Sequence, residues 1–160
     1  MVWCTNGCGV KFQRGDRNRR AAVAQIVTSK YARLYASLAG GFLLLQGVST
    51  LAAQLFPRID RALPQLLEFT QMVKSHSILH IISGLLAMAM LRRGDPWSLS
   101  LFAAGFGAFY GGLGALGIVA RQPSALHMQS FDHPFHLLLG GLGLAAVVAD
   151  RLGSREKALR

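Results

Sequence analysis

The amino-acid sequence predicts an all-α fold, an integral membrane four-helix bundle built from two helical hairpins. Of the 160 residues, 52% are hydrophobic and only 15% are charged, whereas soluble domains carry about a quarter charged residues. All 24 charged residues fall within 77 positions and leave four uncharged windows of 24, 17, 25 and 17 residues. A helix needs roughly 17–25 apolar residues to cross a bilayer, so each window can form one span.

We expect the spans at about 36–56, 75–91, 98–120 and 134–149, within a membrane domain of residues 31–151. Pro57 closes the first span, and the turn-forming run at 92–96 separates the second from the third. Pro134 opens the fourth, because proline suits the first turn of a helix. Strands are a poor alternative, because the windows show no strict apolar–polar alternation and are too long for barrel strands.

Residues 63–74 precede the second span and place Leu63, Leu66, Leu67 and Val73 near one helical face. They form either an interfacial helix or the first turns of a long, tilted second helix. We favour the long helix.

The distribution of Lys and Arg predicts the orientation. Thirteen of the 17 basic residues lie in the N-terminal segment, the loop between the second and third spans, and the C-terminal tail. We therefore expect both termini in the cytoplasm. The basic segment 1–30 is expected to be disordered, with Cys4 and Cys8 as free thiols, and residues 152–160 to form a tail. The net charge of +10 then reflects orientation beside anionic lipids, not a nucleic-acid partner.

The spans repeat in pairs. Residues 39–42 (AGGF) resemble residues 103–106 (AAGF) at an offset of 64, and His80 to Gly84 matches His136 to Gly140 at an offset of 56. The chain therefore reads as two hairpins of the same sense, a parallel repeat. Small residues at four-residue spacing should seal the bundle, because they let helix backbones approach closely. In the third and fourth spans these are Gly107, Gly111, Ala115, Gly141 and Ala145.

All five histidines lie toward the predicted outer side. His76 and His80 share a face of the second span at i,i+4, while His133 and His136 open the fourth span at i,i+3, after Asp132. At 1.5 Å per residue, His80 lies about 18 Å above Arg92, and His136 lies about 21 Å above Asp150. The two histidine pairs therefore fall in matched layers.

Three interpretations of the histidines stay open. His80 and His136 are candidate axial ligands of haem b or a chlorin. Alternatively, a set of outer residues binds Zn or Cu, which suit imidazole with carboxylate: His76, His133, Asp132 and His127. In the third interpretation the histidines only form hydrogen bonds within the bundle, to Gln46, Tyr110 or Ser83. No catalytic motif is present, so we expect no enzyme.

The stretch Asp132–His133–x–x–His136–Leu–Leu–Leu–Gly140, echoed by His76, His80 and Gly84, resembles a family of small four-span bacterial membrane proteins described as a domain of unknown function. The resemblance covers residues 33–151. It implies a four-helix membrane bundle in the inner membrane of a bacterium and supplies no activity.

The absence of a catalytic motif, together with the short loops and small-residue seams, favours a non-enzymatic accessory or interaction subunit of a larger bioenergetic or photosynthetic membrane assembly. Its partners would be the lipid bilayer and other membrane subunits or further copies of the chain. A haem-, chlorin- or metal-binding protein is the alternative, and a small-solute or proton transporter is the third.

Overall fold

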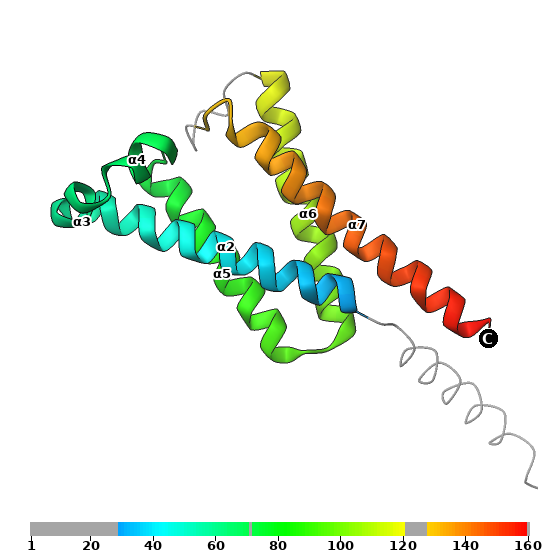
Figure 1. The fold of residues 1–160 in the computed structure, drawn as a ribbon. Coiled ribbons are helices and arrows are strands. Elements are labelled where there is room, and N and C mark those ends of the chain that lie inside the picture. The colour runs from blue at the N-terminus through cyan, green and yellow to red at the C-terminus, as the bar shows by residue number, and fades with distance from the viewer. Residues whose placement is uncertain (1–28, 71, 121–127, 160) are drawn as a thin grey trace, which may run out of the picture.

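The computed structural model describes residues 29–70, 72–120 and 128–159, and this part of the chain is helical and contains no strand (Figure 1). The helices are α2 (Lys30–Leu55), α3 (Pro57–Ala62), α4 (Pro64–Thr70), α5 (Lys74–Arg93), α6 (Pro96–Ala120) and α7 (Asp132–Ala158). Four of them, α2, α5, α6 and α7, are long and apolar enough to cross a bilayer. The all-α four-helix architecture is therefore confirmed, and the chain is a multi-pass membrane protein.

The four long helices pair as two hairpins. Helix α2 packs along α5, and α6 packs along α7. The start of α2, the α5–α6 connection and the end of α7 lie at one end of the molecule, which we call the basic end; α3 and α4 lie at the other (Figure 1). In the described chain no Cα atom of α5 comes within 8 Å of one in α7, so these two helices leave space between them.

The favoured long second helix is wrong. The chain before α5 forms the separate short helices α3 and α4, each beginning at a proline. Val73 is extended, with φ −90° and ψ 162°, and therefore interrupts any helix that would run through it. The side chain of Gln54 donates to the Met72 carbonyl oxygen at 2.8 Å and holds this break against α2.

Helix α7 runs well past the expected end of the fourth span at residue 149. The first buried residue beyond that point is Asp150, whose side chain is 2% exposed. Its carboxylate accepts the backbone N–H groups of Tyr31 at 3.0 Å and Ala32 at 2.8 Å. Asp150 thus caps the N-terminus of a helix in the other hairpin.

Close backbone approaches at glycine reveal the repeat in three dimensions. A Cβ at Gly84 would lie 2.8 Å from the Gly40 carbonyl oxygen, and one at Gly140 would lie 2.7 Å from the Gly107 oxygen. The α5–α7 offset of 56 therefore holds. Gly40 corresponds to Gly107, an offset of 67, so the expected offset of 64 between the first and third spans is wrong by about one turn.

Gly47 and Gly114 agree with this register. A Cβ at Gly47 would lie 2.7 Å from the Ser77 carbonyl oxygen, and one at Gly114 would lie 2.7 Å from that of His133. Ser77 and His133 are again 56 residues apart.

The seam between α6 and α7 follows a different line of residues from the one the four-residue spacing predicts. Gly107 is buried there, and Gly111 meets Gly140. Ala115, Gly141 and Ala145 are exposed instead, and a Cβ at Gly141 would meet nothing within 4 Å. Since a helix has 3.6 residues per turn, a strict i+4 series drifts around the helix by about 40° at each step, whereas alternating steps of four and three stay on the seam.

Candidate metal centre

Three histidines converge at the end of the bundle opposite the basic end. His76 and His80 come from α5 and His136 from α7, and their side chains are 1%, 2% and 0% exposed. Each offers one ring nitrogen such that the three atoms all lie within 4.8 Å of one another. We call these three residues the histidine cluster.

The fold brings the cluster together by spacing and by helix separation. His76 and His80 are one turn apart at the start of α5, and their ring centroids lie 4.6 Å apart. The His136 ring enters from α7 at 5.6 Å from that of His76 and 6.2 Å from that of His80. The three imidazoles thus meet in the space that the backbones of α5 and α7 leave between them.

The ring nitrogens of the cluster have few partners among the described residues. Both nitrogens of His76, both of His136 and Nε2 of His80 are buried without a hydrogen bond. A buried polar atom without a partner costs about 1–3 kcal/mol, and native structures leave few such atoms. Five such atoms in one place make the cluster a candidate ligand site.

Two polar side chains, Gln46 and Asp132, lie beside the imidazoles. Gln46 Oε1 lies 3.1 Å from His80 Nδ1, which assigns the proton to Nδ1 and leaves the lone pair on Nε2. Asp132 Oδ2 lies 4.0 Å from His76 Nδ1, beyond hydrogen-bond distance, and accepts the backbone N–H of Gln129 at 2.7 Å. Acceptors such as Gln46 fix the tautomer and ring direction of metal-binding histidines.

The cluster lies across the repeat. His80 and His136 are equivalent residues of the two hairpins at the offset of 56, and so are His76 and Asp132. The two members of each pair face each other, as the ring distance and the ion-pair distance show. The cluster therefore lies on the pseudo-two-fold axis that relates the hairpins, where each contributes matching side chains.

In the structure, the candidate residues do not group as the two predicted sites grouped them. It brings His76 together with His80 and His136, and it places Asp132 beside them. His133 turns away toward α6, where its ring occupies the space beside Gly117. His127 lies outside the described residues.

One signal that points to the site escaped the sequence analysis. The pattern Met72–x3–His76–x3–His80–x3–Gly84 recurs as Met128–x3–Asp132–x3–His136–x3–Gly140. Both methionines are buried, with 7% and 6% exposure. The repeat motif is therefore longer than the stretch from histidine to glycine, and it includes every residue of the site on α5 and α7.

An aromatic ring packs against the histidine cluster, and a cavity reaches it from another side. The Tyr110 ring lies 5.1 Å from that of His136, and its hydroxyl is hydrogen-bonded to Ser83 at 2.9 Å. A cavity of about 200 Å³ reaches His80 and Asp132 from the side. It is lined by Phe42, Gln46, Thr70, His80, Gln129, Phe131, Asp132 and Phe135.

The donor set suits a single transition-metal ion. Imidazole nitrogens favour Zn, Cu, Fe and Ni, and Zn–N bonds of about 2.0–2.1 Å place tetrahedral ligands about 3.3 Å apart. One nitrogen of each imidazole lies within 4.8 Å of the other two, so the nitrogens need to approach by at most about 1.5 Å to reach that spacing. Asp132, with Oδ2 4.0 Å from His76 Nδ1, is a candidate for a fourth ligand.

The chain has no match among family models, curated proteins or solved structures. Membership of the family that the sequence resembles therefore stays a prediction, and the candidate centre rests on the geometry of this chain alone.

Proposed function

We propose that the chain is a membrane-embedded binding protein for a transition-metal ion, Zn or Cu, held by His76, His80 and His136. The observation that supports it is the convergence of three fully buried imidazoles, five of whose six nitrogens lack hydrogen-bond partners among the described residues. A metal ion would bind one nitrogen of each ring, and the contact of Gln46 with His80 Nδ1 leaves Nε2 of that ring for the ion.

Metal analysis of the purified protein tests this proposal. The protein, stripped with a chelator in detergent and reloaded with Zn(II), Cu(I) or Co(II), should retain about one ion per chain, because the cluster forms one site. His76→Ala, His80→Ala and His136→Ala should each lower the affinity by about tenfold or more. His133→Ala is the matched control, since His133 packs against α6 outside the cluster. Equal binding by all four variants would overturn the proposal.

A tetrapyrrole between His80 and His136 is the alternative occupant. His76 and Tyr110 each contact both of these rings, with centroids 4.6–6.2 Å away. This crowding favours a single ion over a macrocycle that must pass between its two axial ligands. The absorption spectrum separates the two: a Soret band that disappears in His80→Ala or His136→Ala would favour haem b or a chlorin.

An accessory role in a larger membrane assembly is a second proposal. It is favoured by the exposed small residues Gly141 and Ala145 on α7, because small residues facing lipid allow another helix to approach closely. Purification in mild detergent should then yield a complex with a defined second subunit. Gly141→Leu should dissociate that complex, and a chain that is always recovered alone would contradict this role.

A further inference from the structure

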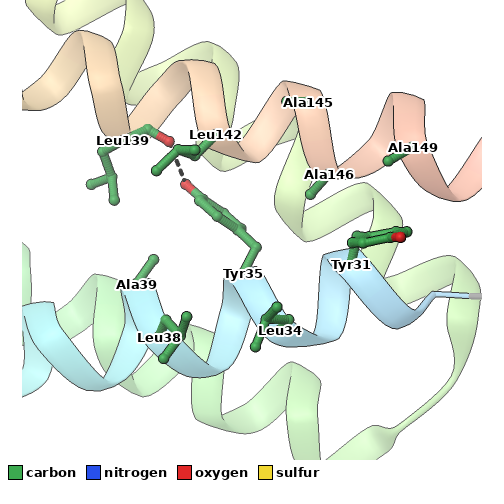
Figure 2. A pocket seen from close by; sticks show the side chains of 10 residues that line it. All are labelled: Tyr31, Leu34, Tyr35, Leu38, Ala39, Leu139, Leu142, Ala145, Ala146 and Ala149. Atoms are coloured by element: carbon green, nitrogen blue, oxygen red, sulfur yellow. Dashed lines mark hydrogen bonds between the residues drawn. The ribbon is translucent and has the colours of Figure 1, made fainter.

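Two grooves run along the junctions between the hairpins. One lies between α2 and α7, has a volume of about 360 Å³, and is shown in Figure 2. The other lies between α5 and α6 and has a volume of about 550 Å³. We call them the α2–α7 groove and the α5–α6 groove.

The repeat relates the two grooves residue by residue. At the offset of 67, Tyr35 of the α2–α7 groove corresponds to Phe102 of the α5–α6 groove. At the offset of 56, Leu86 corresponds to Leu142 in the same way. The molecule therefore provides an internal comparison, in which differences between equivalent positions show what each groove is suited to hold.

The difference lies in polarity at the basic end. The α5–α6 groove ends at Arg93, where its counterpart has Ala149, and it contains Ser98, where its counterpart has Tyr31. Figure 2 shows that the α2–α7 groove is lined by Leu, Ala and Tyr side chains. The Tyr35 hydroxyl in this groove already donates a hydrogen bond to the Leu139 carbonyl oxygen at 3.0 Å. Of these two grooves, only the α5–α6 groove combines an apolar lining with a positively charged side chain at its end.

The dimensions match one leaflet of a bilayer. From Arg93 to Ile82, the far end of the lining along α5, the groove extends about 16 Å at 1.5 Å per residue. The hydrocarbon core of a membrane is about 30 Å thick, so the groove covers the depth of a single acyl chain.

We propose that the α5–α6 groove binds one anionic phospholipid of the leaflet at the basic end, with an acyl chain along the groove and its phosphate at Arg93. Arginine binds phosphate with two parallel N–H donors. The Ser98 side chain at the same end of the groove is hydrogen-bonded to Asp95, so Arg93 is the residue that binds the phosphate. The charge selects the headgroup, and the apolar lining holds the chain. This proposal is independent of the metal centre, which lies at the opposite end of the bundle.

Native mass spectrometry of the protein tests it. The protein is released from mixed micelles holding equal amounts of phosphatidylglycerol and phosphatidylcholine with the same acyl chains. It should retain phosphatidylglycerol about fivefold over phosphatidylcholine, the preference expected from one arginine near the headgroups. Arg93→Gln should remove this preference. Arg92→Gln should keep it, because Arg92 carries the same charge one residue earlier but does not line the groove.

A second pair of variants tests the acyl-chain site. Gly105 lines the groove, and a Cβ there would meet nothing within 4 Å, so Gly105→Leu should fill the groove and reduce retention of both lipids. Gly112→Leu adds the same side chain at another open glycine of α6 and should leave retention unchanged. The proposal is overturned by equal effects of the two arginine variants. It is also overturned if Gly105→Leu lowers the mass of an oligomer and spares the lipid, which would assign the groove to a second copy of the chain.

Discussion

At the residue scale, Asp150 is the polar side chain on which the packing of α2 against α7 most depends. Its buried carboxylate accepts two N–H groups at the start of α2, where no residue of α2 itself forms a side-chain cap. These hydrogen bonds join α2 to α7. The negative charge of the carboxylate also lies at the positive end of the α2 dipole, which is a stabilising arrangement.

Asp150→Ala should therefore lower the free energy of unfolding by about 1–3 kcal/mol, because it leaves two buried N–H groups without acceptors. Asp150→Asn should have a smaller effect, since the amide oxygen still accepts one of them. Unfolding in a denaturing detergent, followed by circular dichroism, measures the difference. Glu68→Ala, at an exposed carboxylate of α4, is the control and should change little.

A second carboxylate, Asp95, links stability to pH. It lies between α5 and α6 and accepts the backbone N–H of Ser98 at 2.8 Å, which caps α6. Hydrogen bonds from the Ser98 side chain and backbone hold the pKa of the Asp95 carboxyl below its usual value. A lowered folded-state pKa means that the cap stabilises the protein above the unfolded-state pKa of about 4. That contribution is lost as the pH falls through the folded-state pKa.

The stability difference between the native protein and Asp95→Asn should accordingly be constant near neutral pH and disappear in acid. Thermal unfolding midpoints of the two proteins across this pH range measure it. A difference that grows as the pH falls would show that Asp95 does not act as an ionised cap.

At the scale of elements, the α6–α7 seam depends on one of two adjacent glycines. A Cβ at Gly140 would collide with the backbone of Gly111 and would lie 2.7 Å from the Gly107 oxygen, whereas one at Gly141 would meet nothing within 4 Å. Backbone atoms cannot move aside as a flexible side chain can. The helices therefore approach at Gly140 and not at its neighbour.

Gly140→Ala should destabilise the bundle by about 1–3 kcal/mol through overpacking. Gly141→Ala should be neutral or stabilising by up to about 1 kcal/mol, because alanine favours a helix over glycine. Unfolding free energies in the same detergent measure both. Similar losses in the two variants would contradict the seam described above. Because the hairpins repeat, Gly84→Ala should behave like Gly140→Ala, since Gly84 contacts α2 as Gly140 contacts α6.

At the scale of the whole molecule, the histidine cluster joins two hairpins whose helices α5 and α7 otherwise leave a gap. A metal bound there would crosslink the hairpins and would bind the folded state alone. At a free metal concentration 100 times the dissociation constant, such binding adds about 2.7 kcal/mol to stability.

Zinc should therefore raise the thermal unfolding midpoint by several degrees, about 2–4 °C per kcal/mol for a chain of this size, and a chelator should reverse the shift. His136→Ala should abolish the response, and His133→Ala should preserve it. An equal shift in His136→Ala would mean that zinc acts elsewhere on the protein.

Orientation is also a property of the whole chain. The basic residues predict that the α5–α6 connection faces the cytoplasm and that the segment between α6 and α7 faces outward. A reporter enzyme that is active only after export should be active when fused after Leu126 and inactive when fused after Arg93. The reverse pattern would place the histidine cluster at the cytoplasmic face.

Much of the fold could be predicted from the sequence because hydropathy is summed along the chain. The charge-free windows located α2, α5, α6 and α7, since no polar backbone or charge is stable within lipid without an internal partner. The separation of α4 from α5 could not be predicted in this way. No strong helix breaker lies in the sequence from Thr70 to Val73. The contact that holds the break comes from Gln54, a residue of α2.

The sequence by itself determined the spans, the basic asymmetry, and the placement of the histidines in layers at one end. The tertiary structure alone decided which histidines meet. The sequence places His133 and His136 three residues apart at the start of the fourth span, yet His136 joins α5 while His133 enters the seam beside Gly117. The physical reason is that spacing fixes angles within a helix, whereas the rotation of the helix about its axis is set by the close contacts of glycines such as Gly140 with the neighbouring helix.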